Sequence, residues 1–139
     1  MIEFKNKEDR MFFTLLHPAL IMIYSDLYLY AKEKHKVHLV ITDTISTPER
    51  DASLGRVSTS HQKGLAIDIR TKDIDAFVVS DIVSYINSRW IYKNYHYLSK
   101  SGIKRLAYYH VGNEEHIHLA IHKKYQNPIM QNQIAEFIQ

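Results

Sequence analysis

The chain has 139 residues, of which nine are histidine and none is cysteine, and this length fits one domain with a substantial core. Hydrophobic residues make up 45% and charged residues 24%, and the net charge is +3, so the composition is that of a globular protein with a mild preference for anionic surfaces. The absence of cysteine excludes a disulfide framework, a thiolate zinc finger, an iron–sulfur cluster and a cysteine nucleophile. A metal site would therefore have to be built from histidine and carboxylate.

The first half of the chain predicts a helix, a strand and a long loop. Pro18 at a first helical turn and apolar residues at helical spacing predict a helix over Pro18–Lys34. The β-rich run Val37–Ile41 predicts a strand. The following stretch, Thr42–Ser60, predicts a loop with one helical turn after Pro48. Because long loops inside compact domains are usually functional, this loop is expected to contribute to a site.

The second half predicts three more strands and a helix. A strand is expected over Leu65–Arg70, and two more over Leu106–Val111 and His116–His122. Asp73 is the expected N-cap of the intervening helix. The apolar residues of that helix are Ile74, Phe77, Val78, Ile82, Tyr85 and Ile86. We expect one α+β domain over residues 1–139, with a core of about residues 18–122 and helices packed on a small, mostly antiparallel sheet.

The apolar stretch Met11–Tyr30 is not expected to cross a membrane. It contains His17, Pro18 and Asp26, which are costly in hydrocarbon. The mixed-charge stretch Glu3–Arg10 precedes it in place of a basic n-region, and no small-residue cleavage site follows. The sequence therefore predicts neither a membrane span nor a signal peptide.

The first chemically informative segment runs from Ser60 to Arg70. Strand alternation places Leu65, Ile67 and Ile69 on one face and Asp68 on the other. His61 lies seven positions before Asp68, an odd separation that would oppose the two side chains on one continuous strand. A turn at Gly64 can bring His61 back towards the carboxylate.

The second segment is Glu114–His122. Here the isoleucine and leucine side chains share the buried face, while His116, His118 and His122 share the other. If the polar faces of the two strands meet, His61, Asp68 and His118 can surround one ion. Three N and O ligands with a fourth position open are typical of a catalytic zinc site, whereas a structural zinc site is closed by a fourth protein ligand.

Two residues near this set are candidates for proton transfer. Glu115 lies three positions before His118 and is the first candidate for the base that takes a proton from a zinc-activated water. His116 shares the face of His118 and is an alternative base, or a donor to a developing oxyanion. Taken singly, these side chains also fit ordinary roles, since Asp68 can pair with Arg70 and the two glutamates can be a solvated turn. The remaining histidines are expected to be ordinary surface or core residues; they are His17, His35, His38, His96, His110 and His122.

The stretch Ser58–Ile69 resembles the Ser-x-His-x-x-Gly-x-Ala-x-Asp signature of the D-Ala-D-Ala carboxypeptidase and L-alanyl-D-glutamate endopeptidase family. Thr59 stands at the usual position of the signature serine. The stretch Glu115–His118 is similar to the acidic-x-x-His ending of that family. The resemblance covers about residues 18–122. It implies a hedgehog-like fold and a Zn²⁺-dependent peptidase that hydrolyses bacterial cell-wall peptidoglycan. Such hydrolases are often encoded by phage or prophage.

Carried over to this chain, the resemblance implies His61, Asp68 and His118 as zinc ligands and Glu115 as the catalytic base. One position departs from the family pattern, because Ser46 stands where an arginine that binds a substrate carboxylate or the transition-state oxygen is expected. Arg50, Arg56 or Arg70 can supply that charge from elsewhere. The protein is expected to be cytoplasmic when made and to act on the wall after release or delivery by another component.

Two other functions remain open at this stage. A peptidoglycan-binding module that keeps the fold and metal but has lost turnover would explain the missing arginine. A small basic nucleic-acid binder would use the positive charge and the ten tyrosines, but the sequence contains no basic stripe or nucleic-acid motif, so we predict no nucleic-acid partner. The sequence leaves open which peptide bond is cut, the biological role in lysis, virion or remodelling, and the oligomeric state.

Overall fold

A computed structural model describes residues 1–90, 94–112 and 114–137. In these residues the helices are α1 (Lys7–Phe13), α2 (Pro18–His35), α3 (Pro48–Ser53), α4 (Ala76–Ser88) and α5 (Pro128–Phe137), with a 3-10 turn at Lys123–Tyr125. The strands are β1 (Glu3–Phe4), β2 (Val40–Asp43), β3 (Ala66–Arg70), β4 (Tyr97–Leu98), β5 (Lys104–Arg105), β6 (Ala107–His110) and β7 (His116–Ala120).

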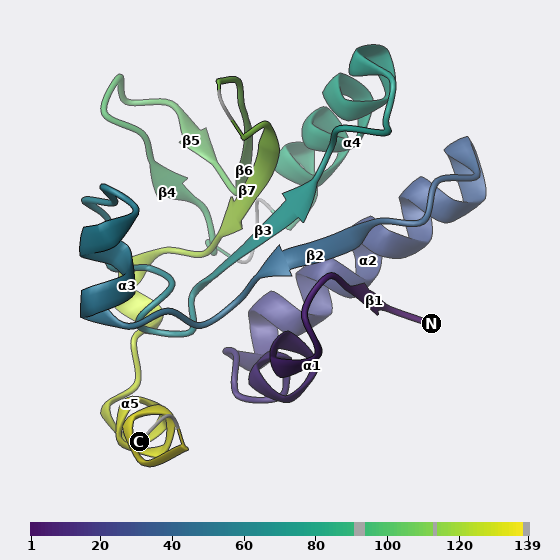
Figure 1. The fold of residues 1–139 in the computed structure, drawn as a ribbon. Coiled ribbons are helices and arrows are strands. Elements are labelled where there is room, and N and C mark those ends of the chain that lie inside the picture. Colours follow the sequence, from purple (N-terminus) through teal and green to yellow (C-terminus); the bar gives the residue numbers. More distant parts are fainter. Residues whose placement is uncertain (91–93, 113, 138–139) are drawn as a thin grey trace.

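The main sheet has the order β1-β2-β3-β7-β6, and β4 and β5 form a separate hairpin (Figure 1). The β2–β3, β3–β7 and β6–β7 pairs are antiparallel, and the short β1–β2 pair is parallel. The expected α+β class with a mostly antiparallel sheet is confirmed.

The core lies between one face of this sheet and helices α2 and α4 (Figure 1). Ile67 and Ile69 on β3 and Ile117 and Leu119 on β7 are fully buried there, as the period-two pattern predicts. Because these residues take the core face, the alternate residues of both strands point to the opposite face, where α3 and the loop around it lie. That opposite face carries the polar cluster described below.

The expected helix at Pro18 is confirmed, with Pro18 at its first turn and the His17 ring accepting a hydrogen bond from Ala19 N at 3.0 Å. The short helix after Pro48 is also present as α3. The expected strand at Val37–Ile41 begins later, at Val40, because α2 continues to His35 and its C-cap Lys36 takes a left-handed conformation.

Three local expectations for the second half are wrong in detail. The cap of α4 is Asp75, which accepts from Phe77 N at 2.8 Å, while Asp73 pairs with Arg70 instead. Ile74, which was expected within this helix, lies before it, and Phe77 lies on its exposed face with a side chain that is 75% exposed. Strand β7 ends before His122, whose ring accepts from Lys124 N and caps the 3-10 turn.

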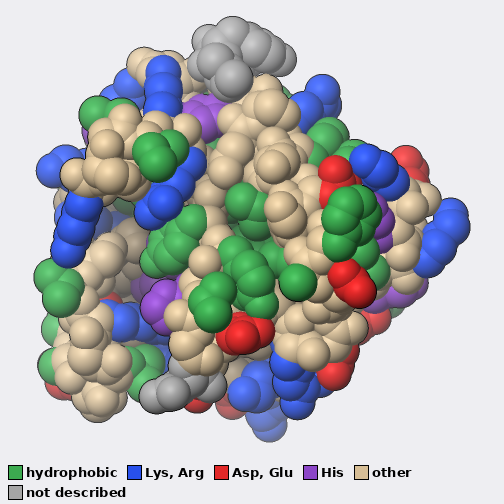
Figure 2. Space-filling view, turned by 90° about the horizontal axis from the view of Figure 1, so that it is seen from above, with side chains coloured by type: hydrophobic (Ala, Val, Ile, Leu, Met, Phe, Trp, Pro, Cys, Tyr) green, Lys and Arg blue, Asp and Glu red, His purple; other side chains and the backbone are tan. Residues whose placement is uncertain are grey.

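In the described residues no helix combines the length and apolar character needed to cross a membrane. On the face drawn in Figure 2, lysine and arginine side chains are scattered around a centre that is mostly uncharged.

Candidate metal centre

A tight turn brings His61 to the sheet. Gly64 has φ +69°, and Leu65 N donates to Ser60 O at 3.0 Å, so the chain reverses between His61 and β3. Because an L side chain at this φ is strained, glycine suits the position. The His61 side chain is buried, and its Nδ1–H donates to the carbonyl oxygen of Thr44 at 2.6 Å. This bond leaves Nε2 directed at Asp68.

The register of the sheet aligns four polar residues on neighbouring strands. Asp43 pairs with Asp68, Asp68 pairs with His118, and His118 pairs with Tyr108. The β2–β3 register shifts between Ile41 and Asp43. A bulge inserts one extra residue and changes which face the following side chain occupies. The shift therefore allows Asp43 to join the polar face although Ile41, two positions earlier, belongs to the core.

Asp68 is at the centre of the cluster. Its Oδ1 lies 3.0 Å from His118 Nδ1, 3.2 Å from His61 Nε2 and 3.7 Å from His116 Nε2. One ligand atom from each of His61, Asp68 and His118 can be chosen so that all three lie within 4.8 Å of one another. The two turn-and-strand segments singled out in the sequence therefore do converge.

The second oxygen of Asp68 is held by Arg56. Arg56 Nη2 lies 3.1 Å from Asp68 Oδ2 and 2.6 Å from Asp43 Oδ2, and its Nη1 donates to Asp51 Oδ1 at 3.1 Å. Since Oδ2 is occupied by the guanidinium, Oδ1 is the oxygen that faces the imidazole nitrogens.

Arg50 completes this charged network next to Ser46. Its Nη1 donates to Asp43 Oδ1 at 2.8 Å and lies 3.4 Å from Ser46 Oγ. Ser46 is the position where the resemblance leads one to expect arginine. The guanidinium of Arg50, one helical turn further on, thus occupies space beside that position.

The electrostatics of the cluster follow from burial and close pairing. Burial alone would raise the pKa of Asp68, but hydrogen bonds with His118 and His61 outweigh it and hold this pKa well below its usual range. For His61, burial acts to lower the pKa, but the bond to Asp68 and the charges of Asp68 and Asp43 raise it overall. For His118, burial dominates and the pKa is lowered. The carboxylate is therefore ionised and His118 favours the neutral form that a metal requires.

The two candidates for proton transfer are placed differently. The Nδ1–H of His116 donates to Glu114 O at 2.8 Å, and its Nε2 is the nitrogen on the Asp68 side. The carboxylate of Glu115 accepts from Tyr109 OH at 2.6 Å. Among the contacts within the described ranges, Glu115 has none with His61, Asp68 or His118.

Arg70 lies farther along the same face. It pairs in register with His116, and its guanidinium donates to Asp73 at 2.5 Å. Of the three arginines considered from the sequence, Arg56 contacts Asp68 and Arg50 lies beside Ser46. Arg70 contacts neither Asp68 nor Ser46.

Sequence reasoning missed several polar residues of this centre. Asp43 and Tyr108 join through cross-strand register, and Thr44 holds His61 through its backbone carbonyl. Asp51 and Gln62 join through the fold of the loop, where Gln62 Nε2 donates to Asp51 Oδ2 at 2.7 Å. The only local signal was the run of polar residues after β2, which does not reveal the bulge.

The donor set fits a zinc ion. Two imidazoles and one carboxylate are ligands that zinc takes in open, water-accessible sites. The hydrogen bond from His61 Nδ1 to a backbone carbonyl is the kind of support that orients a metal-binding histidine. The cluster can hold a metal ion, and its chemistry suits zinc well.

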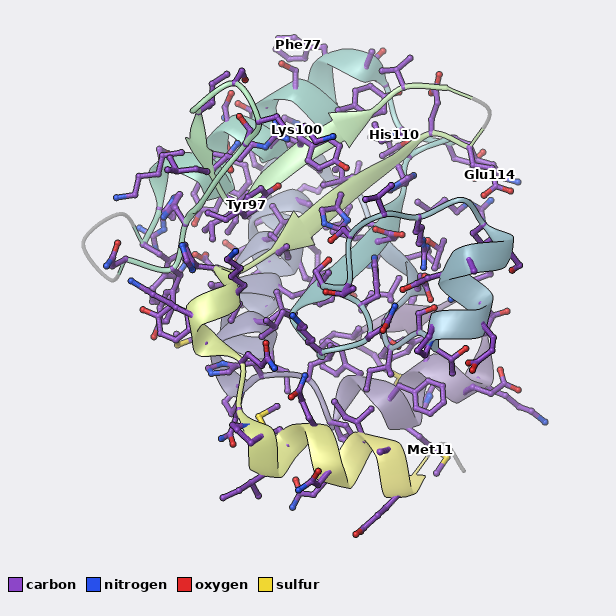
Figure 3. All side chains as sticks on the ribbon, turned by 90° about the vertical axis from the view of Figure 1, so that its left-hand side faces the viewer. Met11, Phe77, Tyr97, Lys100, His110 and Glu114 are labelled. Carbon is purple, nitrogen blue, oxygen red and sulfur yellow. The ribbon has the colours of Figure 1, made fainter. Side chains whose placement is uncertain are left out.

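Two pockets flank the cluster. A pocket of about 490 Å³ includes Asp68, Arg56 and His116 in its lining, and a pocket of about 400 Å³ includes His118, Tyr97 and Ala120. Figure 3 shows the end of β6–β7 that carries His110 and Glu114, and the hairpin that carries Tyr97 and Lys100 on the other side. An extended chain crossing the cluster would have one part in each pocket.

No protein-family model matches the chain, and neither a curated protein nor a solved structure matches it. The relation to the zinc peptidases is therefore a resemblance of two sequence motifs.

Proposed function

We propose that the protein is a zinc-dependent peptidase that hydrolyses peptide bonds of bacterial peptidoglycan. The observation that carries the proposal is the convergence of His61, Asp68 and His118, whose ligand atoms lie within 4.8 Å of one another between two pockets. The two motifs that contain these residues are the ones that resemble the peptidoglycan peptidases. When bound, zinc supplies Lewis-acid polarisation of a water molecule and of a substrate carbonyl.

The residues of the chain support this chemistry by orienting the ligands. Thr44 O binds the proton on His61 Nδ1, so that Nε2, which faces Asp68 Oδ1, is the nitrogen that would bind the ion after giving up its own proton. Arg56 binds Asp68 Oδ2, so that Oδ1 is available on the histidine side. Metal affinity depends on such supporting bonds, and their loss commonly costs tenfold or more.

Proton transfer is assigned in this proposal to His116. Its Nε2 lies on the cluster side, 3.7 Å from Asp68 Oδ1, whereas the Glu115 carboxylate accepts a hydrogen bond from Tyr109. In the reaction, His116 Nε2 takes the proton of the attacking water and returns it to the leaving amine. His116→Gln should retain zinc and lose hydrolysis. If Glu115→Gln loses hydrolysis and His116→Gln does not, Glu115 is the base.

Arg50 is the proposed replacement for the family arginine. Its guanidinium is 3.4 Å from Ser46 Oγ, and its side chain is 45% exposed, so donors remain available for a substrate oxygen. Arg50→Ser should reduce hydrolysis without releasing zinc. The double variant S46R/R50S, which restores arginine at the family position, should recover activity. A double variant as inactive as the single one would contradict this assignment.

The first experiment combines metal analysis of the purified protein with mass spectrometry of digested peptidoglycan. We expect one zinc ion per chain and new peptide termini that name the bond. His61→Ala should lose both properties, while His38→Ala, which changes an exposed histidine outside the lining of both pockets, should keep both. Peptidoglycan left intact by the zinc-loaded protein would contradict peptidase activity.

A second candidate is a zinc-containing peptidoglycan-binding module without turnover. Two observations favour it: Ser46 stands at the family arginine position, and Glu115 contacts Tyr109 rather than the cluster. This function predicts zinc-dependent sedimentation with peptidoglycan, with no release of amino groups from walls of several chemotypes.

A further inference from the structure

The pocket of about 490 Å³ on the His116 side of the cluster is rich in basic residues. Five cationic side chains line it: Lys5, Arg50, Arg56, Arg70 and Lys72. They come from the end of β1, from α3 and its following loop, and from β3 and the residues after it. Three separate chain segments thus direct positive charge to one concavity beside the metal centre.

Only some of these charges are neutralised inside the pocket. Arg50 and Arg56 pair with Asp43 and Asp68. Lys5 and Lys72, in contrast, make no side-chain hydrogen bond or ion pair with any residue that the structure describes. Arg70 pairs with an aspartate three residues away that is 69% exposed, and such exposed pairs contribute about 0–1 kcal/mol. Lys5, Arg70 and Lys72 are therefore available to an anionic ligand.

The pocket also limits what that anion can be. Glu114 and Glu115 lie in the same lining, and like charges repel a polyanion such as a nucleic acid that would have to pass them. The volume of about 490 Å³ is that of a small-molecule site. A single carboxylate on a peptide satisfies both conditions.

The sheet register sets the distance between this anion site and the metal cluster. Arg70 pairs with His116 and Asp68 pairs with His118, so Arg70 is two residues along β3 from Asp68. Two strand residues span about 7 Å, and an extended peptide advances about 3.5 Å per residue. A carboxylate held at Arg70 would thus belong to a residue one or two positions from the reacting bond.

The pocket on the other side has a different character. Its lining includes Tyr97, Leu98 and Ile121, with Lys123 as its cation. The two sides of the cluster therefore differ in charge, and this difference would orient a bound peptide.

We propose that Lys5, Arg70 and Lys72 form a carboxylate-binding subsite, which selects peptides bearing an acidic group one or two residues from the bond to be cleaved. This inference rests on the proposed peptidase function for its reaction, but its binding component can be measured without hydrolysis. It names the substrate class as acidic peptides and places their acidic part on the His116 side.

The test uses two forms of the tripeptide L-Ala-γ-D-Glu-L-Lys, one with the glutamyl α-carboxyl group free and one with it amidated. Binding to the full chain is measured by calorimetry at low salt, with metal removed. We expect the free carboxylate to bind about tenfold more tightly, as for a charge-assisted hydrogen bond at a partly exposed site. The preference should disappear in the double variant R70Q/K72Q and weaken as salt is raised.

The double variant K100Q/K104Q is the matched control and should keep the preference, because it removes the same two charges from the β4–β5 hairpin, whose turn carries Lys100 on the other side of the cluster (Figure 3). Equal affinity for the two tripeptides, no measurable affinity for either, or an unchanged preference in R70Q/K72Q would overturn the subsite. Hydrolysis of both peptides at equal rates would reject the subsite and leave the peptidase proposal standing. A carboxylate preference in binding, without hydrolysis of any wall peptide, would support the subsite and contradict the peptidase function.

Discussion

Replacing Gly64 by alanine should destabilise the protein and weaken metal binding together. Gly64 has φ +69°, and a Cβ there would lie 3.2 Å from Ile134 Cδ1 and 3.4 Å from Leu15 O. The left-handed conformation costs an alanine about 1–2 kcal/mol, partly offset by about 0.4–1 kcal/mol from the reduced freedom of the unfolded chain. Overpacking against Ile134 and Leu15 adds about 1 kcal/mol. We therefore expect the free energy of unfolding to fall by about 2 kcal/mol.

Gly55→Ala is the matched control for this prediction. Gly55 has the same φ, +69°, but a Cβ there would meet nothing within 4 Å, so it reports the backbone cost alone, about 1 kcal/mol. Urea denaturation in the presence of EDTA measures both variants. Zinc titration should then show weakened affinity only for Gly64→Ala, because only this turn positions His61. Equal losses of stability in the two variants, or unchanged zinc affinity in Gly64→Ala, would refute the reasoning.

Three further predictions concern charge and metal. Arg56→Gln removes the guanidinium from Asp51 and Asp68, while Asp43 keeps its pair with Arg50. Because Arg56 is 24% exposed, we expect the unfolding free energy to fall by about 2 kcal/mol rather than by the larger cost of a fully buried pair. A loss below about 0.5 kcal/mol in urea would contradict this. Burial acts to raise the pKa of Asp51, but hydrogen bonds from Gln62 and Arg56 lower it overall. Asp51 therefore stabilises the fold at pH values above its unfolded pKa of about 4, and this contribution is lost as the pH falls through the lower pKa of the folded state. Denaturation between about pH 5 and pH 2 should therefore show a smaller decline for Asp51→Asn than for the unchanged chain, and parallel declines would count against the assignment. Zinc at one hundred times its dissociation constant should stabilise the fold by about 2.7 kcal/mol, measured as a rise in Tm that EDTA reverses, and an equal rise in His61→Ala would mean that the ion binds elsewhere.

The polar faces of β3 and β7 were predictable because they follow from local geometry. Apolar residues at every second position identify the buried face of each strand, and the residues between them must point the other way. Asp68 and His118 were therefore assigned to the right faces without knowledge of the partner strands. The Gly64 turn was equally visible, since glycine is the residue that tolerates its conformation.

The role of Arg56 was not predictable in the same way. The sequence offered Arg50, Arg56 and Arg70 as equivalent candidates, and nothing local distinguishes them. Arg56 reaches Asp43 and Asp68 because the loop after α3 closes over the sheet. Which side chain a loop delivers to a distant strand depends on its whole path, which no short pattern encodes.

The sequence by itself determined the fold class, the two chemically informative segments and the three candidate ligands, because strand alternation and turn residues act over a few neighbouring positions. Only the tertiary structure decided which charges surround those ligands. The register shift in β2 brings Asp43 onto the polar face, and the β6–β7 pairing brings Tyr109 to Glu115. Both depend on how neighbouring strands align, and register is a collective result of turns, bulges and core packing.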